Sequence, residues 1–397
     1  MLQELPKIIS VDDHVIEPAH LFSRWLPKKY QEGGPRHVRT GIGDLKFVQG
    51  KYEYVTDDEG PLADWWFYEN LKAPYRRNIA AAGFHPDEMT LEGITYEEMR
   101  PGCFEPEARL RDMDTNWVEA SLCFPTFPRF CGQTFMEAGD KEVALACVHA
   151  YNDWMVEEWC GDSHGRLIPL TIIPLWDSDL AADEVRRNAN RGVHAVCFSE
   201  MPSQLGLPSI HTDFWDPFLA ACNETHTTIN MHIGSSSSMP RVSPDAPVAT
   251  GIPLSFSNSM ASMCDWVFSG KLNEFTELKL AYSEGQIGWI PYVLERMDDV
   301  WLQHRAWGGV KDLVLEPPSN YYRKHMYGCF FRDRHGVKSL DDIGVDTVTF
   351  EVDYPHVDST WPNTKAIAEE MTRDLDPGSL YKIVRGNAIE MLSLDFD

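Results

Sequence analysis

Positive charge is scarce in this sequence of 397 residues, which has 35 Lys and Arg residues against 61 Asp and Glu residues and a formal net charge of −26. A surface that binds nucleic acid needs basic side chains to meet the phosphates, and an anionic membrane surface attracts the same residues. The composition therefore argues against both kinds of partner. We expect no nucleic acid and no membrane among the partners of this chain.

Long hydrophobic runs and cysteine motifs are also lacking. No run reaches the roughly 18 apolar residues that a membrane-spanning helix needs, and no N-terminal apolar segment resembles a signal peptide. The nine cysteines are odd in number, scattered and never spaced Cys-x-x-Cys. This pattern argues against a zinc ribbon and a disulfide framework and fits a reducing compartment. We expect a soluble, cytoplasmic protein.

Two common catalytic motifs are missing as well. The sequence has no P-loop and no Gly-x-Ser-x-Gly elbow. The motifs that phosphoryl transfer and serine hydrolysis commonly use are therefore missing. A glycosidase-type pair of carboxylates stays open, but it would not account for the histidines described below.

A regular alternation of strand and helix patterns is what the sequence does contain, from residue 105 onward. The predicted strands are 8–14, 118–124, 167–173, 192–198, 227–231, 278–282, 326–331 and 346–352. The predicted helices are 105–116, 143–159, 180–190, 214–224, 255–268 and 290–303, with one or two more within 365–392. About eight strands separated by helices favour parallel βαβ units closed into a (β/α)8 TIM-like barrel, one domain over residues 1–397. An open doubly wound sheet is the alternative, and the lack of Gly-x-Gly-x-x-Gly after the first strand counts against it.

Residues 22–100 interrupt this alternation as a long insertion that is dense in Pro, Gly, charged and aromatic residues, including the run 64–68. Such long segments within compact domains are usually lids or interfaces. Its aromatic cluster fits a cover over a site, a subunit contact or a satellite core. Because the insertion is larger than a small lid needs, we expect an oligomer, either of identical chains or with a related subunit.

Side chains of metal-ligand type stand at the ends of five predicted strands. They are Asp12 and His14 on the first strand, Glu200 after the fourth, His232 after the fifth, Glu284 after the sixth and Asp353 after the eighth. Asp12 and His14 share one face because side chains alternate along a strand. In a parallel barrel all of these ends form the active-site face. Any one of these residues alone is more often a polar group at a strand end whose hydrogen bonds are satisfied. For the first strand, the alternative to metal binding is that Asp13 caps a helix and His14 lies on the surface.

The order Asp-x-His, His-x-Gly, a ligand before Gly, and Asp-Tyr-Pro-His resembles the amidohydrolase superfamily, in particular its amidohydrolase-2 branch of decarboxylase-like members. The similarity covers nearly the whole chain. Two positions depart from the branch: Asp12 replaces the first histidine of His-x-His, and Glu284 replaces a histidine before glycine. Glu200 falls where binuclear members place a bridging lysine or glutamate.

The resemblance, with these replacements, implies an oxygen-rich metal site. Such a site suits iron or manganese, whereas hydrolytic zinc sites favour imidazole. We expect two divalent metal ions, Fe and/or Mn, with Zn as the alternative. Asp12, His14 and Asp353 would hold one ion, His232 and Glu284 the other, and Glu200 would bridge them.

Three functions follow from this site. The first is O2-dependent hydroxylation of a small amino acid or carboxylate, because the site resembles oxygen-activating members such as α-aminoisobutyrate hydroxylase, with Asp353, His356 and Glu200 as catalytic residues. The alternative is a mononuclear Zn or Mn decarboxylase or hydrolase, in which Asp353 or His356 handles protons. The third is a non-catalytic subunit, which the intact ligand set disfavours. His356 is a ligand, an acid–base group, or a loop histidine packed under Trp361.

Overall fold

The chain divides into two units that each gather distant parts of the sequence. The computed structural model describes residues 4–48 and 51–396. The first unit contains the chain up to Val11, Leu175–Glu351 and the chain from Lys365 onward, and the second contains Asp12–Pro174 and Val352–Thr364. The first strand, β1 (Ile8–His14), therefore begins in one unit and ends in the other.

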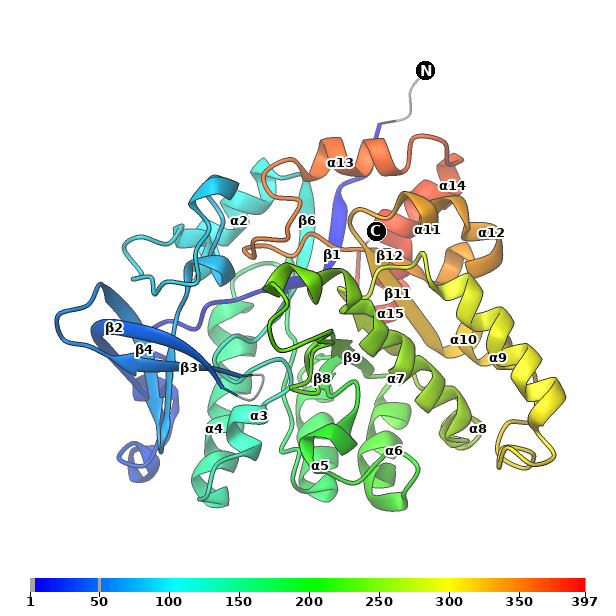
Figure 1. Ribbon diagram of the computed structural model, residues 1–397, viewed down its shortest axis with the longest axis horizontal. Coiled ribbons are helices and arrows are strands. Elements are labelled where there is room, and N and C mark those ends of the chain that lie inside the picture. Colours follow the sequence, from blue (N-terminus) through cyan, green and yellow to red (C-terminus); the bar gives the residue numbers. More distant parts are fainter. Residues whose placement is uncertain (1–3, 49–50, 397) are drawn as a thin grey trace. The chain divides into compact units, whose positions relative to one another are not determined.

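The first unit is built on a five-stranded parallel sheet with the strand order β12-β11-β10-β9-β8. Its strands are β8 (Ala195–Phe198), β9 (Thr228–His232), β10 (Leu280–Ser283), β11 (Met326–Phe330) and β12 (Val348–Phe350). The larger helices are α5 (Ser178–Ala189), α6 (Asp216–Thr225), α7 (Phe256–Phe268), α9 (Ile290–His304), α10 (Pro318–His325) and α13 (Thr364–Met371), and the shorter ones are α8 (Lys271–Glu274), α11 (Arg334–Lys338), α12 (Leu340–Ile343), α14 (Pro377–Tyr381) and α15 (Asn387–Leu392). Parallel strands need such crossovers, and α5 and α6 run side by side (Figure 1).

Local sequence explains the ends and the core of these elements. Asp177 caps α5, since its side chain accepts hydrogen bonds from the backbone N–H groups of Asp179 and Leu180. Every residue of β8, β9 and β10 is buried. Phe198 of β8 packs against Phe218 of α6, with ring centroids 5.1 Å apart. Aromatic packing thus helps to hold α6 on the sheet.

The strand register brings three of the predicted ligands to one edge of this sheet. Ser283 of β10 pairs with His232 of β9, and Phe198 of β8 pairs with Met231. Glu284 directly follows Ser283, and Glu200 is the second residue after Phe198. Because the strands are parallel, Glu200, His232 and Glu284 all stand at the carboxyl edge.

The end of β1 belongs to a three-stranded sheet with the order β1-β6-β7, of which β6 (Val118–Phe124) and β7 (Leu167–Ile168) lie in the second unit and pair in parallel. The helices of this unit are α1 (Leu21–Trp25), α2 (Pro106–Thr115), α3 (Gln133–Met136) and α4 (Lys141–Trp154). The predicted strand 167–173 was wrong in length, because only its first two residues form β7. Pro169 ends the pairing, since proline has no N–H to donate to a neighbouring strand.

Residues 22–100 hold an antiparallel sheet that the sequence patterns did not predict. Its order is β3-β2-β4-β5, with β2 (Arg36–Val48), β3 (Lys51–Thr56), β4 (Leu62–Tyr68) and β5 (Leu71–Pro74), drawn in blue in Figure 1. Trp65 packs with Ile42 and Ala63, whereas its neighbour Trp66 packs against Phe22 and Phe127. Both faces of β4 are therefore buried, so the polar–apolar alternation that marks a strand is lost. The aromatic run packs inside the unit.

Asp64 is the charged centre of this sheet. Its side chain is fully buried and accepts hydrogen bonds from His37 Nε2, from Nε and Nη2 of Arg39 and from the backbone N–H of Tyr96, at 2.7–2.9 Å. Burial acts to raise the pKa of Asp64, but these hydrogen bonds outweigh it and lower the pKa to about 2. The ionised carboxylate therefore stabilises the folded state.

Replacing Asp64 with asparagine should lower the free energy of unfolding by about 2 kcal/mol at pH 7, as a shift of roughly two pKa units implies. The folded-state pKa lies below the unfolded value, so this contribution is complete above about pH 4 and disappears as the pH falls toward 2. Urea unfolding followed by tryptophan fluorescence measures it. Asp87→Asn, which removes a carboxylate with 93% exposure, is the control and should change stability by less than about 0.5 kcal/mol. A difference between Asp64→Asn and the unaltered protein that stays constant from pH 7 to pH 3 would contradict this account.

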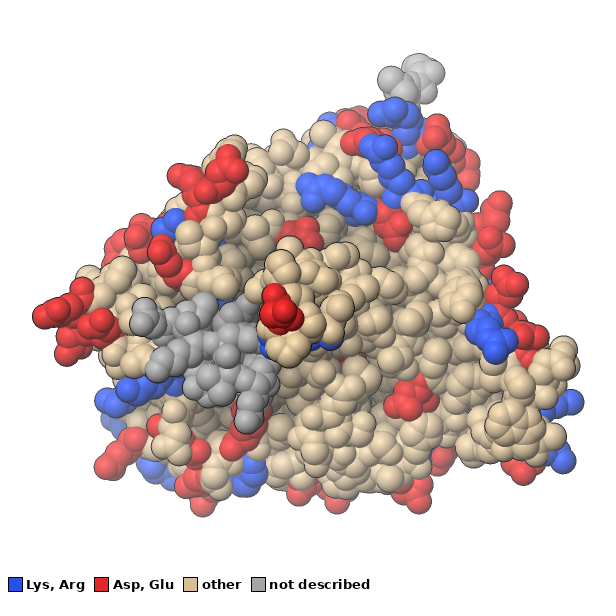
Figure 2. All heavy atoms as spheres, viewed as in Figure 1, with Lys and Arg blue, Asp and Glu red and all other residues tan. Residues whose placement is uncertain are grey.

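The charged surface and the state of the cysteines agree with what the composition predicts. Figure 2 shows acidic side chains on many parts of the visible surface, with Lys and Arg among them. All nine cysteines are free thiols, and Cys264 alone among them is more than slightly exposed. Within residues 4–48 and 51–396, no helix has both the length and the hydrophobicity needed to cross a bilayer.

Candidate metal centre

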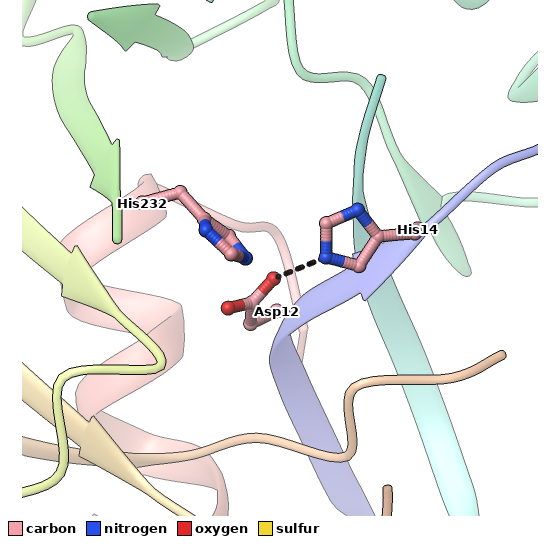
Figure 3. Close-up of side chains that lie close together, drawn as sticks. All are labelled: Asp12, His14 and His232. Carbon is pink, nitrogen blue, oxygen red and sulfur yellow. Dashed lines mark ion pairs between the residues drawn. The ribbon is translucent and has the colours of Figure 1, made fainter. Parts of the chain in front are cut away.

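His14 is the middle of a group of acidic and imidazole side chains in the second unit. Its Nε2 lies 3.6 Å from Oδ1 of Asp12 and 3.3 Å from Oδ1 of Asp353. Figure 3 shows Asp12 and His14 pointing toward one another from β1, and it also labels His232 of β9. Nδ1 of His356 lies 3.0 Å from the same Asp353 oxygen, and its ring stacks on that of His14 with 3.7 Å between centroids. Asp12, His14 and Asp353 are fully buried, and His356 is 15% exposed.

The backbone holds this group together. The N–H of Asp353 donates to the carbonyl of Asp12 at 2.8 Å, and the N–H of His14 donates to the carbonyl of Tyr354 at 2.7 Å. Asp353 has a φ of 58°, in the left-handed region that aspartate tolerates better than most residues. Residues 353–354 are therefore fastened to the end of β1.

Asp13 has a structural role, and the interpretation of Asp13 as a helix cap was wrong. The strand continues through it to His14, so no helix begins there. Its buried carboxylate accepts hydrogen bonds from the N–H of Tyr354, at 2.8 Å, and from the hydroxyl of Ser121. His14 is buried and is not a surface histidine. One interpretation placed His356 under Trp361, but the ring that packs against Trp361 is that of Tyr354, with centroids 5.1 Å apart.

Arg109 supports His14 and was missed by sequence reasoning. It is fully buried, and it donates hydrogen bonds to the carbonyls of His14 and Gly102 and to Sγ of Cys123. Its guanidinium also lies over the ring of Tyr354, 4.3 Å from the centroid. Nothing in a helix pattern over residues 105–116 distinguishes a buried arginine from an exposed one.

His232 and Glu284 form a pair in the first unit. Nδ1 of His232 lies 2.6 Å from the carbonyl oxygen of Ile233, and Nε2 lies 3.6 Å from Oε2 of Glu284. Burial lowers the pKa of His232, against the opposing effects of Glu284 and the Ile233 carbonyl. A neutral imidazole that donates its Nδ1–H to a carbonyl presents the lone pair of Nε2, as a metal-binding histidine does.

Glu200 lies in a cradle of three donors in the same unit. Its Oε1 accepts hydrogen bonds from the N–H of Gly234, the hydroxyl of Ser236 and the side-chain amide of Asn258, at 2.9–3.0 Å. Its buried Oε2 has no hydrogen-bond partner among the described residues. Burial raises the pKa of Glu200 to about 7 in spite of the three donors. The serine run after His232 thus holds Glu200, and the part of Asn258 was not predicted.

Glu351 is a further buried carboxylate that the sequence did not reveal. Its Oε2 accepts a hydrogen bond from the backbone N–H of Glu284 at 3.0 Å. Glu284 has a φ of 56°, a left-handed backbone that a glutamate seldom adopts. Glu351 therefore fixes the backbone from which the Glu284 side chain leaves β10.

The residues of the second-unit group fit a divalent metal ion. Two ligand atoms bound at about 2.1 Å to one ion, at a tetrahedral angle, lie about 3.4 Å apart. The distances from His14 to Asp12 and Asp353 are 3.6 and 3.3 Å. His14, Asp353 and His356 also offer ligand atoms that all lie within 4.8 Å of one another. Glu17 and His194 lie outside this group: Glu17 accepts a hydrogen bond from the N–H of Thr126, and Nδ1 of His194 lies 3.0 Å from the carbonyl oxygen of Thr225.

Comparison with known proteins adds sequence and structural relatives. The sequence model of the family described as amidohydrolase matches residues 54–394. A gamma-resorcylate decarboxylase from Rhizobium sp. (strain MTP-10005) is 23% identical over 345 residues, which cover 79% of this chain and 94% of that protein. An amidohydrolase from Mycobacterium avium subsp. paratuberculosis has a similar structure, with a TM-score of 0.68, 20% identity and coverage of 97% of this chain and 99% of that chain. The 5-carboxyvanillate decarboxylase of Novosphingobium aromaticivorans, solved with bound manganese, has a TM-score of 0.59 and 16% identity over 74% of this chain and 82% of its own.

The structural likeness confirms the predicted fold, a (β/α)8 barrel of the TIM type. The strands that correspond in chain order to the eight predicted ones are β1, β6 and β7 of one sheet and β8 to β12 of the other, with the β2–β5 sheet inserted after β1. Glu200, His232, Glu284 and Asp353 follow or end the fourth, fifth, sixth and eighth of them, as predicted.

Proposed function

Because the chain belongs to the amidohydrolase family, we propose that it is a metal-dependent enzyme that removes CO2 from a hydroxylated aromatic carboxylic acid without oxidation. The group around His14 is the observation that carries the proposal, since buried carboxylates and imidazoles at co-ligand spacing suit a divalent ion. The names of two relatives, a gamma-resorcylate decarboxylase and a 5-carboxyvanillate decarboxylase, support the reaction and the class of substrate.

The hypothesis of O2-dependent hydroxylation gains no support from these relatives. It rested on the exchange of histidines for Asp12 and Glu284 and on a bridging role for Glu200. The cradle around Glu200 weakens that role, because a carboxylate that bridges two ions commonly uses both oxygens and Oε1 already accepts three hydrogen bonds. We therefore favour the alternative, non-oxidative reaction with one metal ion.

Asp12, His14 and Asp353 are the proposed ligands in the second unit. His232 and Glu284 are the proposed ligands in the first unit, because both stand at the carboxyl edge of its parallel sheet, where the active sites of barrel enzymes lie. Three carboxylates and two imidazoles suit manganese, the ion bound to the Novosphingobium enzyme, better than zinc. The bound ion would orient the substrate and draw negative charge toward its oxygens.

Decarboxylation breaks the bond between the ring carbon and the carboxylate, releases CO2 and leaves the electron pair on the ring carbon, which must take a proton. We assign that proton to His356, whose Nδ1 is held by Oδ1 of Asp353. Glu200 keeps one oxygen without a hydrogen-bond partner and a pKa of about 7, so it can hold a proton near neutral pH and donate a hydrogen bond to the substrate.

Removal of the metal tests this function directly. Protein treated with a chelator should no longer release CO2 from 2,6-dihydroxybenzoate, which is gamma-resorcylate, or from 5-carboxyvanillate, because the substrate is no longer oriented or polarised. Addition of Mn2+ should restore activity at about one ion per chain, measured by elemental analysis beside the assay. Undiminished turnover by protein that holds no metal would overturn the proposal.

A further inference from the structure

The insertion is fastened to the segment that carries Asp353 and His356. The backbone N–H groups of Ala81 and Ala82 donate to the carbonyl of Pro355 at 2.7 and 3.2 Å, and the N–H of Val357 donates to the carbonyl of Asn78 at 3.0 Å. These hydrogen bonds flank His356 on both sides. The residues just after β5 therefore fix the position of the His356 backbone.

The insertion is also fastened to the chain just after His14. Glu17, three residues further on, is fully buried, and its carboxylate accepts hydrogen bonds from the N–H groups of Thr126 and Phe127 at 2.8 and 2.9 Å. The hydroxyl of Tyr75 lies 3.0 Å from Oε2 and from the carbonyl oxygen of Glu17. That hydroxyl accepts in turn a hydrogen bond from Nε1 of Trp66 at 2.7 Å.

Tyr75 itself is held firmly on the insertion. Its N–H donates to the carbonyl of Asp64 at 2.9 Å, and its carbonyl accepts from the N–H of Ile94 at 3.0 Å. The side chain is 2% exposed. A buried hydroxyl with a donor on one side and a carboxylate on the other transmits the position of the sheet to Glu17.

We propose that Tyr75 is a positioning residue for the metal centre. Its hydroxyl contacts Glu17 and so ties the insertion to the strand that carries His14, while the residues that follow Tyr75 hold the loop of His356. The insertion is then a support of the metal site. This inference rests on the proposed function, because it assumes that His14 binds the ion. Outer partners that orient metal ligands typically change metal affinity or activity by 10- to 100-fold when they are replaced.

Tyr75→Phe tests the proposal, with Tyr68→Phe as the matched control. Tyr68 is also a buried tyrosine of the insertion, 3% exposed, and its hydroxyl has no hydrogen-bond partner among the described residues. Electron paramagnetic resonance of bound Mn2+ gives both the dissociation constant and a spectrum of the ligand environment. We expect a dissociation constant for Mn2+ that is about 10- to 100-fold higher and an altered spectrum in Tyr75→Phe, and no change in Tyr68→Phe.

The outcomes separate this inference from the proposed function. Wild-type affinity and an unchanged spectrum in folded Tyr75→Phe overturn the positioning role, even if its melting temperature falls, since a purely structural residue would do the same. Failure of the unaltered protein to bind Mn2+ overturns the proposed function instead. If Tyr75→Phe does not fold, Glu17→Gln, which keeps the size of the side chain, is expected to weaken Mn2+ binding in the same direction, and unchanged binding overturns the inference.

Discussion

Replacement of Asp353 with asparagine is expected to lower CO2 release at least about 1,000-fold and to remove most of the bound metal. One oxygen of Asp353 lies 3.3 Å from the His14 nitrogen and 3.0 Å from the His356 nitrogen, so we expect this carboxylate to serve both the proposed ion and the proposed proton donor. Asparagine keeps the shape and loses the negative charge. Elemental analysis and steady-state turnover measure the two effects.

Asp358→Asn is the control for this variant. Asp358 is exposed and lies five residues beyond Asp353 on the same segment, so its replacement should leave metal content and turnover within about twofold of the unaltered protein. If Asp353→Asn keeps one ion per chain and near-normal turnover, Asp353 is neither a ligand nor part of the proton path.

Replacement of His356 with asparagine should lower kcat by about 100- to 10,000-fold while Mn2+ stays bound, because an acid–base group is lost and the proposed ligands remain. The ring stacks on that of His14 and is only partly exposed, so some loss of stability should accompany it. His335→Asn, at an exposed histidine of α11, is the control and should leave kcat unchanged. Loss of the metal together with kcat would instead make His356 a ligand, and a higher KM with normal kcat would limit it to substrate binding.

The placement of the candidate ligand residues at strand ends could be predicted because it depends on local patterns. Each strand of the barrel is a short apolar run, and the polar residue that ends it is visible in the sequence. His232 and Ser283 pair in register, so Glu284 comes to the same sheet edge as His232 without any long-range information beyond the parallel order. The barrel followed from the count of such runs.

The partners of these residues could not be predicted, since they come from distant parts of the chain. Arg109 reaches the carbonyl of His14 across 95 positions, and Glu351 reaches the N–H of Glu284 across 67. Asn258 supports Glu200 from α7 in the same way. The insertion sheet was missed because Trp65 and Trp66 are both buried on opposite faces, which hides the period of a strand.

The type of a ligand residue also did not reveal how many ions it can hold. The carboxylates Asp12, Glu200 and Glu284 suggested a pair of iron or manganese ions, but the sequence does not show that one oxygen of Glu200 is already bonded to three donors. The number of hydrogen bonds that a carboxylate oxygen accepts depends on the fold. For Glu200, the three hydrogen bonds favour a role in holding a proton over a role in bridging two metal ions.

Release of labelled CO2 under strictly anaerobic conditions distinguishes non-oxidative decarboxylation from oxygenation most directly. The substrate is 2,6-dihydroxybenzoate labelled in its carboxyl carbon, and the protein carries about one Mn2+ per chain. We expect one labelled CO2 for each resorcinol formed, at the same rate with and without O2. A reaction that stops without O2, or that consumes O2 and yields a hydroxylated product, would rule out non-oxidative decarboxylation and restore the oxygenase hypothesis.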